Sequence, residues 1–179
     1  MFSGKYILLR AIEETDINKI SIWNFDNEIA QYFESRFPNN ILEQKKWFDA
    51  QINQPNKKKL IIVDKANNTP IGMVGIMKID HINKNCEVGV TIGDKDYWGK
   101  IHGKEALKLT MDYLFFQLNM QTIYITVLEE NERSIHFFKK FGFVQNGLLK
   151  DMVYKDGKYQ SYVWMSVQKN NYQPFIIAS

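Results

Sequence analysis

Residues 125–143, ITVLEENERSIHFFKKFGF, join the end of a strand to a short helix. The strand, 122–129, is rich in β-branched residues, which favour extended structure. Asn131 follows the strand directly and precedes the helix, and Ser134 comes three residues later. Gly142 closes the helix, and glycine readily takes the left-handed conformation that ends many helices. The stretch therefore predicts a strand–turn–helix unit with polar side chains at the turn.

A second unit of this kind precedes it at 87–107, EVGVTIGDKDYWGKIHGKEAL. Gly99 and Gly103 stand beside Lys100 and Lys104, directly before an apolar helical pattern. A helix N-terminus exposes unpaired N–H groups that attract anions, and glycine lets a phosphate approach the main chain. The alternative is a turn that needs glycine only for its backbone angles. The segment lacks GxxxxGK[ST] and GxGxxG, which excludes a P-loop and argues against a dinucleotide fold.

The composition bounds the class of protein. The chain of 179 residues is 45% hydrophobic and 24% charged, as expected for one globular domain spanning 1–179. A formal net charge of +3 is too small to indicate nucleic acid as a partner. Cys86 is the one cysteine, which excludes an internal disulfide and a cysteine metal cluster. We see no signal peptide and no membrane span, so a cytoplasmic protein without a membrane partner is expected.

The remaining segments alternate between the two kinds of secondary structure. Helical patterns occupy 15–25, 40–52 and 103–118, and strand-like runs occupy 5–12, 60–65, 70–80 and 86–93. Residues 143–167 predict two strands joined by a hairpin at Lys155, Asp156 and Gly157. The expected fold class is α+β (mixed α/β), with a mostly antiparallel central sheet and helices on both faces.

The order of these elements, together with the stretches 87–107 and 127–143, resembles the GNAT superfamily of acetyl-CoA-dependent N-acetyltransferases. The resemblance extends from ILLRAIEETD (7–16) to the last hairpin and is strongest to the branch that includes ribosomal-protein, spermidine and amino-sugar acetyltransferases. It implies a GNAT-like fold, acetyl-CoA as co-substrate, no metal, and a primary amine of a small molecule as acceptor. An amino-sugar nucleotide and a polyamine lead the acceptor candidates.

The resemblance also implies an acyl-CoA site. The family motif is Gln or Arg, two free positions, Gly, one free position, then Gly or Ala. Here Gly103 keeps the last position, whereas Trp98 replaces the polar residue and Ile101 the middle glycine. The residues implied for cofactor binding are Val90, Thr91, Ile92, Trp98, Gly99, Lys100, Ile101, His102, Gly103, Lys104, Asn131, Ser134 and Phe138. Backbone N–H groups of 99–104 would hold the pyrophosphate, and 90–92 would pair with the pantetheine arm.

The chemistry needs a base for the amine, a donor for the thioester oxygen and a leaving thiolate. Many relatives carry a glutamate on this strand that activates a water, and Glu87 matches it; the alternative is a structural carboxylate. A backbone N–H near Val90 is the expected oxyanion donor. Where many relatives have a tyrosine as general acid, this chain has Phe138, which cannot donate a proton. His81, His102 and His136 are scattered and suggest no metal site.

The acceptor pocket is expected at Tyr32, Phe33 and Glu34, where ring faces and a carboxylate can hold a cationic amine. The alternative is an aromatic core edge with an exposed glutamate. The final hairpin, with Tyr154 and Tyr159, either closes this pocket or forms the edge of a homodimer. Two other functions stay open: a peptide or ribosomal-protein N-terminal acetyltransferase, and a non-catalytic acyl-CoA-binding domain, which the departures at 101 and 138 motivate.

Overall fold

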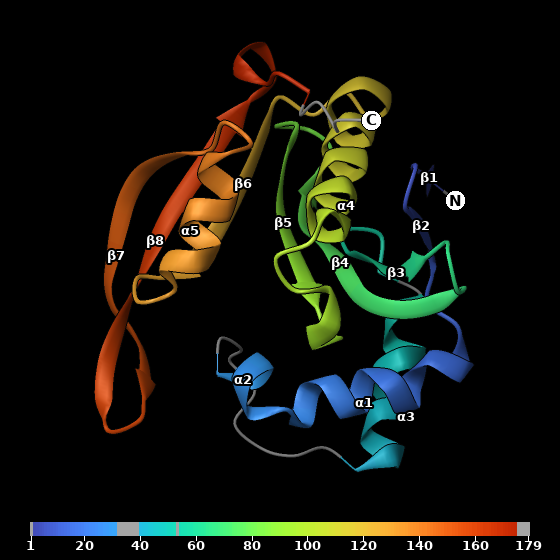
Figure 1. Ribbon diagram of the computed structural model, residues 1–179. Helices are drawn as coiled ribbons and strands as arrows, with labels where there is room; N and C mark the ends of the chain where they lie inside the picture. The colour runs from blue at the N-terminus through green and yellow to red at the C-terminus, as the bar shows by residue number, and fades with distance from the viewer. Residues whose placement is uncertain (1, 32–39, 53, 175–179) are drawn as a thin grey trace.

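The computed structural model describes residues 2–31, 40–52 and 54–174 (Figure 1). The described strands form one eight-stranded sheet in the order β1-β2-β3-β4-β5-β6-β8-β7. These strands are β1 (Phe2–Ser3), β2 (Ile7–Ala11), β3 (Lys58–Asp64), β4 (Thr69–Asp80), β5 (Asn85–Ile92), β6 (Thr122–Leu128), β7 (Val144–Lys155) and β8 (Lys158–Gln168). All neighbouring pairs among them are antiparallel except β5 and β6. The expected mostly antiparallel sheet is confirmed.

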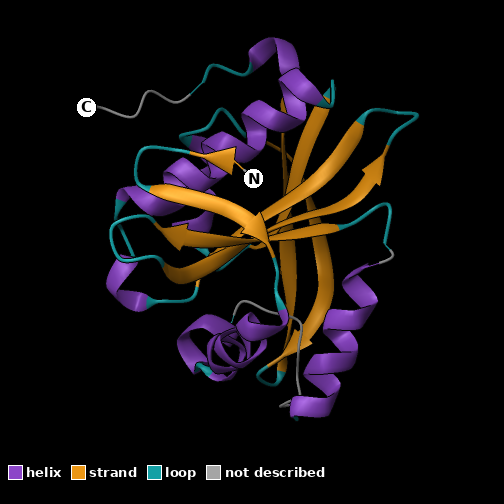
Figure 2. Ribbon diagram, turned by 90° about the vertical axis from the view of Figure 1, so that its right-hand side faces the viewer, coloured by secondary structure: helices purple, strands orange, loops and turns teal. Residues whose placement is uncertain are grey.

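Helices cover both faces of this twisted sheet, as Figure 2 shows. The helices are α1 (Ile17–Phe25), α2 (Asn27–Ala30), α3 (Ile41–Ile52), α4 (Ile101–Asp112) and α5 (Glu132–Lys139). Short 3₁₀ turns occupy Glu14–Asp16, Lys95–Tyr97 and Lys169–Asn171, and a π-helical turn, Tyr113–Gln117, extends α4. Among the helices of the described residues, none is long and apolar enough to cross a membrane.

The core consists of two clusters because successive strand residues face opposite sides of the sheet. Ile7 and Leu9 of β2 pack in the larger cluster with α4 and α5. Leu8, between them, packs in the smaller cluster, where α1, α2 and α3 supply Trp23, Ile29 and Trp47, among others. The strands from β2 to β4 are therefore covered on both faces, which anchors the N-terminal half of the sheet.

Strands β5 and β6 share only the beginning of their length. They pair in parallel at Asn85 with Thr122, Cys86 with Ile123 and Glu87 with Tyr124. Beyond Glu87 the two strands diverge (Figure 1), while β5 stays paired with β4 as far as Ile92. The edge of β5 that faces β6 thus keeps backbone groups without a partner strand, between the two units that the sequence singled out.

Two local features agree with or refine the expectations. The predicted hairpin is confirmed, and Asp156 (φ 51°) and Gly157 (φ 79°) have the positive φ values of a tight two-residue turn. Lys155 Nζ donates hydrogen bonds to the carbonyls of Ala30 and Gln31, so the hairpin reaches α2. Helix α4 begins at Ile101, two residues earlier than predicted, which places Gly103 inside its first turn.

Candidate active site

A cleft of about 650 Å³ opens where β5 and β6 diverge. Its walls come from α2, β5, the turn before α4, the first turn of α4, and α5. The described residues that line it are Glu28, Ile29, Val90, Thr91, Ile92, Tyr97, Trp98, Gly99, Lys100, Gly103, Lys104, Asn131, Glu132, Arg133, Ser134, His136, Phe137 and Lys140. The structure therefore brings together ten of the thirteen residues that the sequence predicted for acyl-CoA binding.

One wall is the N-terminus of α4. Lys100 is its N-cap residue and makes no side-chain capping bond, so the first-turn N–H groups are not satisfied by that residue. Gly99, with φ 76°, adopts a conformation that suits glycine. A Cβ built on Gly103 would lie 3.4 Å from Ile92 Cγ1, so a larger side chain would fill the space between α4 and β5. Backbone donors and open space are what an anionic pyrophosphate needs.

The departure at Trp98 has a structural counterpart on the opposite wall. Trp98 Nε1 donates a hydrogen bond of 2.7 Å to the carbonyl of Ile92, which fixes the indole. The Arg133 guanidinium carbon lies 4.5 Å from the centre of a Trp98 ring, a cation–π distance. A cation from α5 therefore lies over the residue that replaces the polar side chain of the motif. Lys100, Lys104 and Lys140 also line the cleft and add positive charge.

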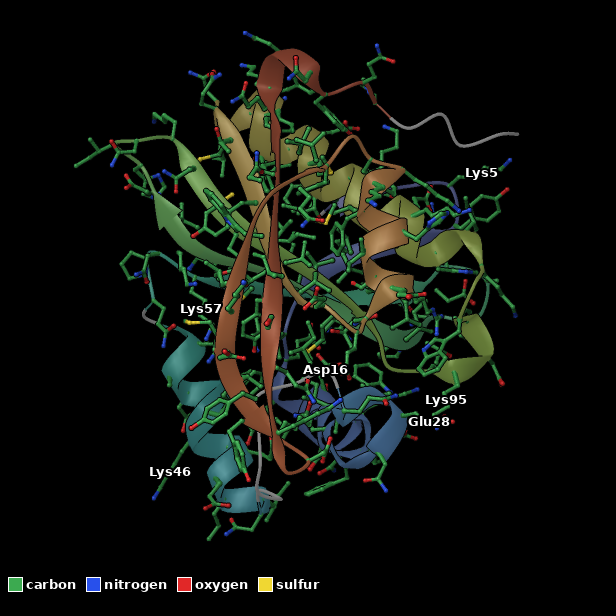
Figure 3. All side chains as sticks on the ribbon, turned by 90° about the vertical axis from the view of Figure 1, so that its left-hand side faces the viewer. Lys5, Asp16, Glu28, Lys46, Lys57 and Lys95 are labelled. Carbon is green, nitrogen blue, oxygen red and sulfur yellow. The ribbon has the colours of Figure 1, made fainter. Side chains whose placement is uncertain are left out.

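One of the acidic residues that line the cleft, Glu28, is paired with a lysine. Glu28 of α2 lines the cleft and forms an ion pair with Lys95, which also contacts Asp26 at 2.7 Å. Figure 3 shows Glu28 and Lys95 next to each other below α5. Because Lys95 offsets one of the two negative charges, Asp26 and Glu28 together repel an anionic ligand less than two isolated carboxylates would.

The side chain of Asn131 caps α5. Its Oδ1 accepts a hydrogen bond of 3.0 Å from the Ser134 backbone N–H. Both residues line the cleft, on the wall opposite Val90 and Ile92. Asn131 thus orients the first turn of α5 in the cleft, and the family resemblance implied that Asn131 and Ser134 bind the cofactor.

Glu87 does not line the cleft; it lies on β5 in a polar cluster of its own and is only 7% exposed. Its Oε2 is 2.8 Å from Lys78 Nζ, and its Oε1 accepts a hydrogen bond from the Thr126 hydroxyl. Tyr124 pairs with Glu87 across the two strands. Burial and the neighbouring Glu87 charge raise the pKa of Tyr124. Cys86 and Val88, the neighbours of Glu87 along β5, pack in the core on the other face.

Three predicted residues do not line the cleft. Phe138 is 4% exposed and packs edge-on against Phe143, with ring centres 5.2 Å apart. The side chain of His102 instead approaches Asp64, with Nε2 3.4 Å from Oδ1. Ile101 lies at the start of α4, outside the lining. Backbone contacts of 101 and 102 with a cofactor stay predictions.

The structure does not test the residues predicted for acceptor binding. Tyr32, Phe33 and Glu34 lie outside the described residues. Tyr154 and Tyr159 contact each other edge-on at the hairpin, with ring centres 5.1 Å apart, and both are exposed.

Several lining residues were missed by the sequence prediction, and one pattern could have found four of them. Arg133, His136, Phe137 and Lys140 follow the spacing i, i+3, i+4, i+7, which puts them on one face of a helix. Glu28, Ile29, Tyr97 and Glu132 carry no such signal. In the described part of the chain, no group of three or more His, Cys, Asp or Glu side chains could hold a metal ion.

Comparisons with known proteins cover almost the whole chain. A family model described as an acetyltransferase (GNAT) domain matches residues 7–144. The spermidine N(1)-acetyltransferase of Escherichia coli (strain K12) is 26% identical over 172 residues, which are 96% of this chain and 91% of that protein. A putative ribosomal N-acetyltransferase of Bacillus subtilis (strain 168) is 26% identical over 102 residues, which are 57% of this chain and 55% of that protein.

A solved structure has the same fold. The crystal structure of spermidine N-acetyltransferase from Vibrio cholerae, in complex with CoA and spermine, matches with a TM-score of 0.87 at 25% identity. The match covers 94% of this chain and 99% of that one. The expected fold class is therefore confirmed.

Proposed function

The chain belongs to the GNAT acetyltransferase family, and we propose that within this family it acetylates a primary amine of a polyamine. The protein is an acetyl-CoA-dependent N-acetyltransferase whose acceptor is the primary amine of a small molecule. The observation that carries the choice of a polyamine is the match of nearly the whole chain to a relative bound to CoA and spermine. An amino-sugar nucleotide is the other acceptor that the sequence suggested.

Different walls of the cleft would bind different parts of acetyl-CoA. Backbone N–H groups at the start of α4, with Lys100, Lys104 and Arg133, would hold the pyrophosphate. The edge of β5 at Val90–Ile92 would hydrogen-bond the pantetheine arm, because it has no partner strand on that side. The Ile92 carbonyl already accepts a hydrogen bond from Trp98 Nε1, so the other backbone groups of this edge would serve the arm. When bound, acetyl-CoA supplies the activated acetyl thioester. The anionic pyrophosphate and the extended pantetheine arm of acetyl-CoA would therefore both contact groups of complementary chemistry.

Glu87 is the proposed base. It is the carboxylate at the point where β5 and β6 separate, and it is buried next to Thr126 and Tyr124. A buried carboxylate at that position can take a proton from the amine, directly or through a water. The backbone N–H near Val90 is proposed to donate to the developing oxyanion. No side chain is required for that second role.

Thiol release in the presence of different amines tests this function. We expect release from acetyl-CoA with spermidine, and much less with an amino-sugar nucleotide or a peptide amine. Cys86 does not disturb a thiol reagent, since it is fully buried and burial raises its pKa to about 12. Release with the peptide alone would favour the ribosomal-protein alternative, which the shorter Bacillus subtilis match supports. Binding of acetyl-CoA without release for any amine would favour the non-catalytic alternative.

Substitution of Gly103 tests the cofactor site. Gly103→Val should weaken acetyl-CoA binding about tenfold or more, because the added methyl groups enter the cleft between α4 and Ile92. Calorimetry measures the affinity. Gly147→Val is the control, because a Cβ at Gly147 meets no heavy atom within 4 Å and this residue is not part of the cleft. Unchanged affinity in a folded Gly103→Val protein would show that the anion binds elsewhere.

The pH profile tests the consequence of Phe138. An essential general acid would make the rate fall on the alkaline side, and Phe138 has no proton to give. Burial and the Glu87 charge raise the pKa of Tyr124, so this phenol keeps its proton to beyond about pH 10. We expect kcat/KM for the amine to stay flat up to about that pH.

The measurement is a pH–rate series at saturating acetyl-CoA, with folding checked by circular dichroism at each pH. A decline well below that limit, in protein that is still folded, would reveal a substitute acid, and Tyr154 and Tyr159 would be the first residues to replace. The homodimer and the cytoplasmic location expected from the sequence stay predictions.

A further inference from the structure

Lys78 reaches Glu87 because of an irregularity in β4. Met77 pairs with Glu87 across the sheet, so regular alternation would send the next side chain to the opposite face. The register of β4 and β5 shifts between Met77 and Asp80, and Lys78 has φ 49°, in the left-handed region. Bulges of this kind re-aim side chains. Here the irregular backbone accompanies an ammonium group placed 2.8 Å from Glu87 Oε2.

The surroundings of that ammonium suit an alkyl cation. Glu87 supplies the negative charge, and Thr126 holds its other oxygen in place. Tyr124, the cross-strand partner of Glu87, contacts Trp164 edge-on with ring centres 6.1 Å apart. A carboxylate flanked by aromatic rings is a recurrent arrangement for binding organic ammonium groups. Trp164 is 40% exposed, so the cluster can be reached from solvent.

We propose that the Lys78 ammonium occupies the position that the primary ammonium of the acceptor takes on Glu87, and that the acceptor must displace it. Lys78 then acts as an internal competitor that sets the apparent affinity for the amine. This inference rests on the proposed function, since it concerns the acceptor of the same reaction. It assigns to Lys78 a role in acceptor specificity, because an uncharged acceptor cannot replace its charge on Glu87.

The exchange keeps the charge at Glu87 balanced, because one ammonium group replaces another. A buried carboxylate without a counter-ion is costly, so Glu87 needs a cation in both states. The Lys78 side chain is 68% exposed, so its ammonium regains water when it leaves. Because Lys78 is largely exposed, its ion pair with Glu87 is weaker than a pair buried on both sides. The incoming ammonium therefore competes against a weak partner and, unlike Lys78, belongs to the reacting molecule.

The test is calorimetry with spermidine as probe and CoA-loaded protein. Lys78→Met keeps most of the stem and removes the charge, and it should tighten spermidine binding about fivefold. Lys45→Met is the matched control, because Lys45 is also exposed and lies 2.8 Å from a carboxylate, that of Glu14, on another part of the chain. Lys45→Met should leave the affinity unchanged.

A third comparison isolates the ion pair. In a Glu87→Gln background, Lys78→Met should give no gain, because the site of competition is gone. Four results would overturn the inference. Lys78→Met could bind spermidine no more tightly than the wild type, or Lys45→Met could gain as much affinity. The gain in affinity could also persist in the Glu87→Gln background, or no variant could bind spermidine at all. Turnover of spermidine by the wild type is measured separately. Its absence would contradict the proposed function, whereas the calorimetric comparison would still decide the role of Lys78.

Discussion

Glu87→Gln is expected to lower kcat by about a hundredfold or more, the usual loss when a general base is removed. The amide cannot accept the proton of the amine, although it keeps the size of the side chain and can still accept the Thr126 hydrogen bond. Acetyl-CoA binding should barely change, because Glu87 does not line the cleft. Steady-state kinetics with saturating amine and separate calorimetry with acetyl-CoA measure the two effects.

Glu14→Gln provides the matched control, because Glu14 also forms an ion pair with a lysine but lies away from the cleft. Its kcat should equal that of the wild type. Near-normal kcat in Glu87→Gln would mean that Glu87 is a structural carboxylate, the alternative that the sequence left open. The ion pair with Lys78 and the bond from Thr126 would then be its function.

Of the substitutions proposed for this protein, Glu105→Gln should lower the free energy of unfolding the most. The Glu105 carboxylate on α4 is 2% exposed and accepts hydrogen bonds from the backbone N–H groups of Lys5, Tyr6 and Ile7, at 2.6, 2.8 and 2.9 Å. An amide replaces one of the two acceptor oxygens with a donor, so at least one of these buried or part-buried hydrogen bonds is lost and its N–H meets another donor. We expect the free energy of unfolding to fall by about 3 kcal/mol or more.

Urea denaturation measures this loss. Glu43→Gln is the control, because Glu43 also accepts a hydrogen bond from a backbone N–H, that of Asn40 at 2.8 Å, but in an exposed position. Its substitution should cost no more than about 1 kcal/mol. If Glu105→Gln cost as little as Glu43→Gln, the carboxylate would not be the attachment of α4 to the start of β2.

The sequence alone was sufficient to predict most of the regular helices and strands of this fold. The β-branched run of β6 and the turn residues of the hairpin act over a few neighbours, so local preference decides them. Asn131 before α5 is of the same kind, since its side chain needs only the N–H of Ser134, three residues away. The family resemblance then implied a GNAT-like fold, which local preference cannot give.

Most of the chemistry near Glu87 depends on contacts between distant residues. No local signal places Lys78 at a positive φ, and the register shift that accompanies it depends on the pairing of β4 with β5. The position of Arg133 over Trp98 likewise joins α5 to a turn more than thirty residues earlier. His102 was expected among the cofactor-binding residues, whereas its side chain approaches Asp64 of β3. Such pairs become visible only when the sheet is assembled.

The acceptor is tested most directly by identifying the product in a competition. The wild-type protein is incubated with acetyl-CoA and equal concentrations of spermidine, an amino-sugar nucleotide and a peptide with a free N-terminus. The products are then separated and identified by mass spectrometry. We predict that spermidine carrying one acetyl group accumulates in step with the released thiol, while the other two amines stay unmodified. Acetylation of the nucleotide or the peptide, with spermidine unchanged, would contradict the proposal.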